Sequence, residues 1–404
     1  MMRKDIPGEP PYSTVIAVIA ATTVAQVASA MGSAVFPVIA PKLAPALGVP
    51  PSFVGYQTSL IYGTAMIGTC FLGGVIARHG ACRTMQASLV LCVIAMVLTA
   101  MASFAALVIA SILLGIGMSM MNPATAHLLY RFSPPGNRNL IFSVKQTGVP
   151  LAWLLLALIA PGIALAWGWR WALAPVLALA TVMLLVLQTV RARWDDDRGP
   201  GAAVGTSLLS GLRVLWQPPA LRWLAIASFC YSFMQLCLGS FLVTMMVEEG
   251  DYSLVDAGLL LSLTQAAGVA GRIFWGWCAD RSGRGLAILF WLNVVMTACC
   301  VATAAVTPRW HAFALIALFA AFGATAVGWN GIFLAEVARR SPRGMVSVAV
   351  GGAMVWNFGG ILVGPAAFAT VFQETGSYTA TYGWLTAVAV VGLVLITAAR
   401  RAAR

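Results

Sequence analysis

Long apolar segments alternate with short polar loops along almost the whole chain of 404 residues. A helix needs about 20 apolar residues to cross a bilayer, and these segments reach that length. The first segment exceeds the apolar core of about 7–15 residues in a cleaved signal peptide, so we expect it to be retained. The pattern predicts twelve membrane-spanning helices at 13–38, 52–76, 84–102, 104–130, 140–165, 171–191, 221–247, 255–276, 285–306, 310–337, 345–371 and 379–399.

The longest polar interruption separates two blocks of six predicted helices. It begins near Arg191, and its WDDDRGPG stretch is typical of a flexible linker. The chain is therefore predicted to comprise an N-terminal segment (1–12), a first six-helix bundle (13–191), a linker (192–220), a second bundle (221–399) and a tail (400–404).

Three landmarks recur in the same order in both blocks, which indicates a duplicated unit. An Asn followed nine residues later by Arg occurs at Asn122 and again at Asn330, and a Gly-Trp pair precedes both the sixth and the twelfth helix. GGVIARHGACR after the second helix matches GWCADRSGRG after the eighth, at Gly73/Gly276, Arg78/Arg281 and Gly80/Gly283.

On these motifs the chain resembles the major facilitator superfamily along its whole length, and GWCADRSGRG resembles a complete copy of the family's signature loop. The resemblance implies an all-α integral membrane fold of two pseudo-symmetric six-helix bundles, with alternating access around a central cavity. It also implies a conformational latch, in which we expect Gly276 to allow close helix packing, Asp280 to pair with a neighbouring Arg or a helix N-terminus, and Gly283 to form the turn. The candidate latch residues are Gly73, Arg78, Gly80, Gly276, Asp280, Arg281, Gly283, Arg284 and Glu336. In the first copy Ala77 occupies the Asp position, so we expect the latch of the first half to be weaker or to use other side-chain contacts.

Composition and charge place most of the chain in lipid. Apolar residues make up 60% and charged residues 9%, against about 45–50% and about 25% in soluble proteins. The net charge of +12 does not indicate nucleic-acid binding, because the cations lie between apolar segments and form no basic patch. Nineteen Lys and Arg fall on one predicted side and three on the other, Lys42, Arg170 and Arg309. Cytoplasmic loops carry such an excess, so we expect both termini to be cytoplasmic, in a bacterial inner membrane.

Two cations, Lys145 and Arg272, fall inside predicted helices, and no Asp or Glu occurs between Glu9 and Asp195. An anionic substrate would neutralise these cations, since arginine binds carboxylates bidentately and lysine acts as a movable point charge. Alternatively, Arg272 belongs to the latch and Lys145 extends to the membrane surface.

Two further resemblances concern these cations. AGRIFWGWCADRSGR resembles the eighth helix of oxalate/formate antiporters and monocarboxylate carriers, which implies that Arg272 contacts a substrate carboxylate. The eleventh helix has Trp356 and Asn357 where those carriers have a second cation. FSVKQTGVP resembles facilitators grouped with cyanate and nitrate permeases, which adds inorganic anions as candidate substrates.

Polar side chains at membrane depth are costly in lipid, so we expect them to line a cavity or to join helices. Thr22, Gln26, Ser29 and Ser33 form one stripe on the first helix. His127 could carry a coupling proton or simply bond to a helix backbone. The candidate substrate-binding residues, besides Lys145 and Arg272, are Gln26, Tyr62, Asn122, Tyr231, Gln235, Gln265, Trp329, Asn330 and Asn357.

These features predict a secondary active transporter of a small organic anion, working as a monomer in membrane lipid, with the proton as a candidate coupling ion. One alternative is a proton-coupled drug or metabolite exporter, although the helix-four Arg of such exporters is missing. A second is a copper importer, since Cys230, Met234 and Cys237 share a helix face. A third is a sensor that binds a ligand without transporting it. No phosphate loop, metal-ligand spacing or nucleophile motif is present, so we expect no enzyme, cofactor, resident metal or nucleic-acid partner.

Overall fold

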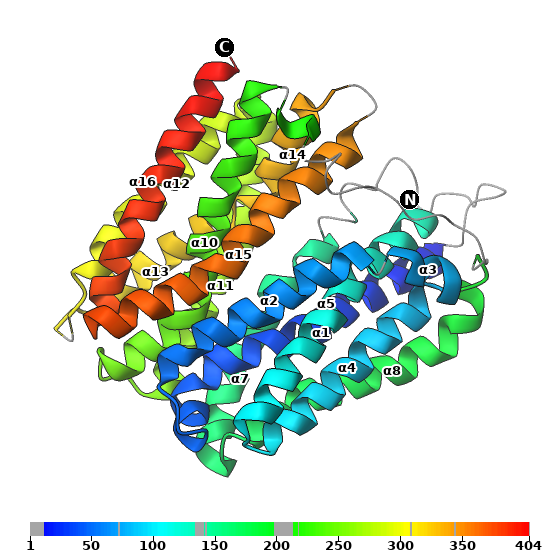
Figure 1. Cartoon of the computed structure of the whole chain (residues 1–404), viewed down its shortest axis with the longest axis horizontal. Coiled ribbons are helices and arrows are strands. Elements are labelled where there is room, and N and C mark those ends of the chain that lie inside the picture. The colour runs from blue at the N-terminus through cyan, green and yellow to red at the C-terminus, as the bar shows by residue number, and fades with distance from the viewer. Residues whose placement is uncertain are drawn as a thin grey trace. The chain divides into compact units, whose positions relative to one another are not determined.

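The computed structural model describes residues 12–71, 73–133, 141, 144–197, 213–216, 218–307, 309–342 and 345–403, and these residues form helices and loops without β-strands. Most of the predicted N-terminal segment, residues 198–212 of the predicted linker, and Phe142 and Ser143 of FSVKQTGVP lie outside the described residues. The α-helices (Figure 1) are α1 (Tyr12–Ala46), α2 (Val54–Phe71), α3 (Gly73–His79), α4 (Ala81–Ala100), α5 (Phe104–Phe132), α7 (Gly148–Trp167), α8 (Ala174–Trp194), α10 (Pro219–Glu248), α11 (Leu254–Ser282), α12 (Gly285–Ala304), α13 (Ala312–Ala326), α14 (Asn330–Arg340), α15 (Val346–Thr375) and α16 (Tyr378–Ala402).

Eleven helical segments in the described part of the chain are long and apolar enough to cross a membrane. They correspond to eleven of the predicted spans. The predicted span at 52–76 corresponds to α2 and α3, and α2 is not among the eleven because Tyr, Gln, Thr and Ser interrupt its apolar sequence. The all-α membrane fold predicted from the sequence is confirmed.

Helix ends follow from local side-chain chemistry. Ser253 Oγ accepts a hydrogen bond from the backbone N–H of Asp256 and so caps α11, and Ser377 caps α16 in the same way. Gly283 (φ 63°) and Gly376 (φ 65°) end α11 and α15 in the left-handed conformation, which is strained for residues with a Cβ. The turn predicted at Gly283 is therefore present.

Contacts divide the chain into two compact units. Unit 1 comprises Met1–Ser33, Thr64–Ala152 and Leu173–Gly205, and unit 2 comprises Ala34–Gly63, Trp153–Ala172 and Thr206–Arg404. This division cuts across α1, α2 and α7, so it differs from the predicted boundary between bundles 13–191 and 221–399. The two-bundle division stays a prediction.

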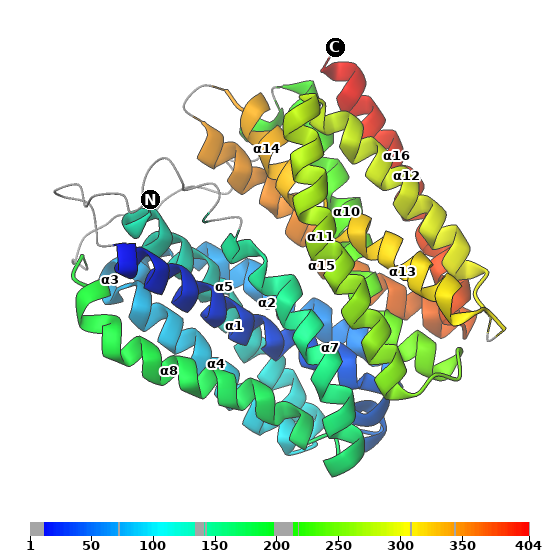
Figure 2. The ribbon, with the colours of Figure 1, turned by 180° about the vertical axis from the view of Figure 1, so that it is seen from behind.

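Unit 1 is held together by a core of small and flexible apolar side chains. α4 packs against α5 and α8, and α8 lies beside α4 in both Figure 1 and Figure 2. The hydroxyl of Ser88 on α4 donates to the carbonyl of Gly117 on α5 at 2.7 Å, because the glycine lets the two backbones approach. The core includes Val18, Ala25, Met85, Leu89, Met121, Leu128, Ala180, Met183 and Leu187.

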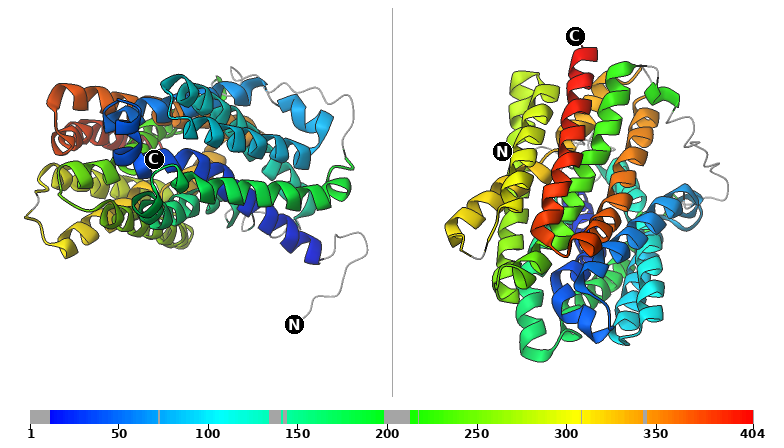
Figure 3. Two further views of the ribbon diagram at one scale, coloured as in Figure 1. Left: turned by 90° about the horizontal axis from the view of Figure 1, so that it is seen from below. Right: turned by 60° about the vertical axis from the view of Figure 1, so that its left-hand side comes forward.

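Unit 2 has an aromatic core. α10 packs against α15 and α16, and these three helices lie side by side in the right-hand view of Figure 3. Phe241 of α10 stacks on Phe368 of α15 with ring centroids 4.2 Å apart. Tyr382 of α16 meets the edge of Phe368 at 5.0 Å. Such aromatic pairs contribute stabilising free energy beyond that of the apolar area that they bury.

Segments from the first predicted bundle pack inside unit 2. Ser59 on α2 accepts the backbone N–H of Ala366 on α15 at 3.1 Å, and the Tyr56 hydroxyl lies 2.8 Å from that of Thr370. On α11, the Ser262 hydroxyl donates to the carbonyl of Leu154 on α7 at 3.0 Å. These contacts join α2 to α15 and α7 to α11.

Candidate functional site

A buried lysine and its amide neighbours form the polar cluster of unit 1. Lys145 lies in the span Val144–Trp167 and is 3% exposed. Its Nζ donates to Oδ1 of Asn122 on α5 at 2.8 Å and to Oε1 of Gln146 at 3.2 Å. Both acceptors are neutral, and the ion pairs found among the described residues of unit 1 involve other side chains. The structure therefore brings Lys145 and Asn122 together and holds the ammonium among amides.

The polar stripe of α1 is buried in unit 1. Thr22 and Ser33 donate their hydroxyls to carbonyl oxygens of their own helix, at 2.7 and 2.9 Å. Gln26 is also buried, but its Oε1 has no hydrogen-bond partner among the described atoms. Because buried polar groups are normally paired, Gln26 is the stripe residue with unused capacity for hydrogen bonding.

A break in the tenth predicted helix positions Arg272 of unit 2. α13 and α14 are separated by residues 327–329. Arg272 on α11 donates from Nε to the carbonyl of Val327 at 3.1 Å, and Trp275 donates from Nε1 to that of Ala324 at 3.1 Å. Side chains of α11 thus satisfy carbonyl groups beside the interruption, as backbone at membrane depth requires.

Glycines on α11 make this approach possible. A Cβ on Gly271 would collide with the backbone carbonyl of Ala324, and a Cβ on Gly268 would lie 2.6 Å from the Val327 side chain. Because backbone cannot move aside as a flexible side chain can, Gly271 is required for the α11–α13 contact.

Gln235 joins two predicted site residues of unit 2. Its Oε1 accepts from Nε1 of Trp329 at 3.1 Å and from Nδ2 of Asn330 at 3.2 Å. Tyr231 packs on the Trp329 ring at 5.1 Å, and its hydroxyl donates to the Leu289 carbonyl at 2.7 Å. Tyr231 is 2% exposed, so it positions Trp329 and does not offer a free hydroxyl.

The other predicted binding residues are buried in unit 2. Tyr62, Gln265 and Asn357 are 8%, 6% and 6% exposed. The backbone carbonyl of Asn357 accepts the hydroxyl of Ser232 at 2.8 Å, which ties α15 to α10.

Comparison with known proteins decides the family. The profile of the Major Facilitator Superfamily matches residues 22–365. The chain belongs to the Major Facilitator Superfamily. It is therefore a multi-pass membrane protein and a secondary transporter of small molecules, not an enzyme.

Solved structures share the fold of this superfamily member at low sequence identity. One is a peptide transporter POT in complex with sulfate, with 14% identity, a TM-score of 0.75, and coverage of 95% of this chain and 94% of that one. A Glu-to-Gln mutant of POT has 15% identity, a TM-score of 0.77, and coverage of 98% and 96%. The same mutant with sulfate has 15% identity, a TM-score of 0.76, and coverage of 99% and 96%. No curated protein matches the chain in sequence.

The superfamily signature loop of the second half is built around Glu336 in this structure. Glu336 of α14 is 1% exposed and forms ion pairs with Arg339 and Arg340. A Cβ on Gly285, the first residue of α12, would collide with the Glu336 carboxylate, and Arg339 donates to the carbonyl of Gly283 at 3.2 Å. The buried carboxylate thus lies at the N-terminal end of α12, where negative charge is favourable.

Two expectations about this loop need qualification. Around Gly276, a Cβ would meet open space, so the predicted close helix approach at Gly276 is wrong and occurs instead at Gly271. Asp280 is exposed and takes no part in the ion pairs found among the described residues of unit 2. Arg281 and Arg284 are exposed at the same end.

The corresponding loop of the first half uses a carboxylate from elsewhere in the chain. Asp195, directly after α8, accepts the backbone N–H of Cys82 at 2.7 Å and that of Arg83 at 3.1 Å. Gly80 precedes α4 with φ 90°, and a Cβ there would collide with Asp195. Asp195 caps α4, so the first residues of the predicted linker are packed against unit 1. Arg78 is exposed, and the side-chain surroundings of Gly73 and Ala77 lie outside the described part.

His127 belongs to an ionic cluster beside this cap. Its Nε2 lies 2.7 Å from Oδ2 of Asp197, and Arg131 pairs with Asp196 at 2.5 Å and with Asp197 at 3.3 Å. The sequence left two roles open for His127, a bond to the helix backbone and the transfer of a coupling proton. The structure shows a carboxylate partner in place of the backbone bond, and the proton-transfer role stays a prediction.

The cysteines considered for copper lie in the core of unit 2. Cys230 and Cys237 are 3% and 0% exposed, and Met234 between them is 0% exposed. Among the described residues, no group of three His, Cys, Asp or Glu could hold a metal ion.

Sequence reasoning missed three features. Gln146 had a visible signal, because it is the polar neighbour of Lys145. Asp195 had a weaker one: it follows Arg191 by four residues, and the two side chains lie 3.9 Å apart. The only sequence signal for the interruption at 327–329 is Gly328, and a single glycine within a long apolar segment does not predict a helix break.

Proposed function

We propose that the protein transports a small organic anion, with Lys145 and Arg272 as the cations that bind the carboxylate. The observation that carries this proposal is the Lys145 ammonium, which is buried, hydrogen-bonded to neutral Asn122 and Gln146, and outside the ion pairs found among the described residues. A buried charge is costly unless it is paired, so pairing with the Lys145 ammonium would contribute favourable binding free energy to an anionic substrate.

Arg272 supports the same proposal from unit 2. Its Nε donates to the Val327 carbonyl at 3.1 Å, and a guanidinium group binds carboxylates through paired N–H donors. It lies against an interrupted membrane helix, and such interruptions commonly form the substrate sites of transporters because half-helix N-termini favour anionic groups. α14 begins at Asn330, directly after this interruption.

A carboxylate is favoured over a zwitterion. The structural neighbours are named as peptide transporters, and a free peptide carries an ammonium group as well as a carboxylate. Between Glu9 and Asp195 this chain has no acid, and Glu336 is already paired with Arg339 and Arg340. A carboxylate complements the positive charge of Lys145 and of Arg272, whereas an ammonium group would be repelled by both.

The test is a thermal-shift screen of the purified protein, followed by flux in proteoliposomes. Small carboxylic acids should stabilise the wild type, and Lys145→Gln or Arg272→Gln should weaken binding at least about ten-fold, since a hydrogen bond to a charged group contributes about 1.5–3 kcal/mol. Lys42→Gln, which removes an exposed lysine, is the matched control and should bind like the wild type.

Three outcomes would overturn the proposal: stabilisation by peptides, cationic drugs or Cu(I) but not by acids; acid binding that survives both substitutions; or binding without flux under any imposed gradient. Proton coupling is part of the proposal and predicts acid uptake driven by an imposed pH gradient. We also propose a bacterial inner-membrane location with both termini cytoplasmic, which tag accessibility in spheroplasts tests.

A further inference from the structure

Two neighbouring pockets lie at the arginine-rich end of unit 2, and their chemistry differs. The first, of about 360 Å³, lies between α11 and α12, and apolar side chains provide most of its surface. The second, of about 150 Å³, is mainly polar and is lined by Arg284, Arg340 and Arg400 together with the turn before α12. Arg284 and Ala287 line both pockets, so the two lie next to each other.

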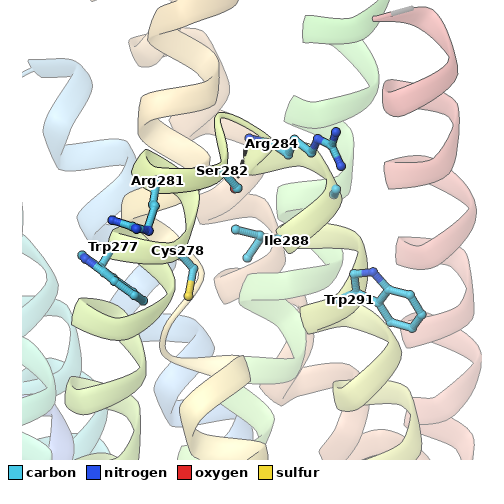
Figure 4. Close-up of a pocket in the computed structure, with 8 residues that line it drawn as sticks. Trp277, Cys278, Arg281, Ser282, Arg284, Ile288 and Trp291 are labelled. Atoms are coloured by element: carbon cyan, nitrogen blue, oxygen red, sulfur yellow. Dashed lines mark hydrogen bonds between the residues drawn. The ribbon is translucent and has the colours of Figure 1, made fainter.

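Two tryptophans border the apolar pocket. Figure 4 shows Trp277 of α11 and Trp291 of α12 on its two sides, Cys278 and Ile288 between them, and Arg281 and Arg284 towards the loop. Trp277 and Trp291 are 58% and 63% exposed. Tryptophan concentrates at the level of lipid headgroups because its ring is both apolar and able to donate a hydrogen bond. The two exposed tryptophans therefore favour a position of this pocket near the lipid headgroups.

The polar pocket has a surplus of positive charge. Arg340 forms an ion pair with Glu336, and Glu336 forms a second ion pair with Arg339. Arg400 lies over the Phe290 ring with its guanidinium carbon 4.5 Å from the centroid, and Arg281 lies over Trp277 at 5.9 Å. None of the ion pairs found in the described part of unit 2 includes Arg284 or Arg400. These two guanidinium groups have donors for an anion.

We propose that this double pocket binds an anionic phospholipid, with its phosphate at Arg284 and Arg400 and an acyl chain against Cys278, Ile288 and Trp291. A basic pocket between membrane helices suits an anionic headgroup, and the adjoining apolar pocket suits the chain attached to it. A free phosphate would use only the polar pocket, so the adjacent apolar pocket, which shares Arg284 and Ala287 with it, favours a lipid. Neither pocket is lined by Lys145 or Arg272, and the proposal does not depend on which substrate is transported.

The proposed lipid would also stabilise the signature loop. The polar pocket is lined by Gly283 and Gly285, the residues that end α11 and begin α12. A phosphate bound there would bridge arginines of three elements, namely the turn before α12, α14 and α16. We therefore expect the lipid to raise the unfolding temperature of the protein.

The experiment is native mass spectrometry of delipidated full-length protein with phosphatidylglycerol and phosphatidylcholine of identical acyl chains. Wild-type protein should retain phosphatidylglycerol preferentially. Each arginine removed should weaken this binding about five-fold, because a basic residue near an anionic lipid contributes about that factor. The variants are Arg284→Gln and Arg400→Gln, singly and together. Arg78→Gln removes the matching exposed arginine of the first loop and should leave the preference unchanged.

A second measurement tests the acyl chain. Phosphatidylglycerol brominated along its chains should quench the protein's tryptophan fluorescence, and Trp291→Phe should remove part of that quenching without reducing phosphate contact. Arg284→Lys with Arg400→Lys keeps the charge and should bind between the wild type and the Gln variants, which separates loss of charge from loss of folding.

The proposal is overturned if phosphatidylcholine is retained equally, or if the double Gln variant keeps the wild-type preference for phosphatidylglycerol. It is also overturned if inorganic phosphate raises the unfolding temperature as much as phosphatidylglycerol does and Trp291→Phe leaves the quenching unchanged. That last result would assign the polar pocket to a soluble anion.

Discussion

Asp195 supplies to α4 the carboxylate that its own signature loop lacks. The first loop has Ala77 at the position of Asp280, yet α4 begins against a buried acid that accepts two of its free backbone N–H groups. Those N–H groups have no partner within the helix, so the cap satisfies them and also places negative charge at the positive end of the helix dipole. Gly80 leaves the space that the carboxylate occupies.

Replacing this carboxylate should destabilise unit 1. Asp195→Asn removes the charge and one of the two acceptor oxygens, and we expect the free energy of unfolding to fall by about 1–2 kcal/mol. Asp196→Asn is the matched control, because Asp196 is 57% exposed and pairs with Arg131 at the surface; such a pair contributes less than about 1 kcal/mol. Thermal unfolding in detergent measures both. Equal effects of the two substitutions would contradict the capping role.

At the level of helices, α11 has glycines with opposite surroundings. Gly271 lies against the carbonyl of Ala324, whereas Gly276 faces open space. Gly271→Ala should therefore cost about 1–3 kcal/mol of stability through overpacking, and it should displace Arg272 from the Val327 carbonyl and weaken acid binding. Gly276→Ala should be neutral or stabilise the helix by up to about 1 kcal/mol. Unfolding and ligand-induced thermal shifts measure both variants, and a stable Gly271→Ala protein with unchanged acid binding would show that the contact is not needed.

The sequence could predict those elements that depend on local residues, but not those that depend on tertiary contacts. Spans such as α10 and α12 follow from apolar length alone, and the turn at Gly283 follows from a residue that tolerates positive φ. The interruption at 327–329 depends on tertiary partners: Arg272 and Trp275 lie about fifty residues away in sequence and satisfy its carbonyl groups. Likewise, Lys145 and Arg272 could be singled out as charges inside helices, but their partners Asn122 and Val327 come from other elements of the chain.

For the molecule as a whole, the contacts of α2 with α15 and of α7 with α11 carry a consequence for transport. They join segments of the first and second predicted bundles inside unit 2, and we expect such contacts to break during an alternating-access cycle. Gly55 on α2 lies against the carbonyl of Pro365, and Gly258 on α11 lies against the carbonyl of Ala157. The packing depends on glycine because polar backbone comes within contact distance at these points.

Gly55→Ala should therefore shift the protein towards conformations in which α2 and α15 separate. The added methyl group would collide with the backbone of α15, which cannot rotate away. Considered alone, α2 has a higher helix propensity with alanine than with glycine. Hydrogen–deuterium exchange should then accelerate at 54–63 and at 365–370 and stay unchanged in α4 and α8. Gly162→Ala is the matched control, since a Cβ at Gly162 meets open space, and its exchange should equal that of the wild type. If Gly55→Ala accelerates exchange uniformly across the protein, the glycine supports global stability, and these contacts are not the ones that transport must break.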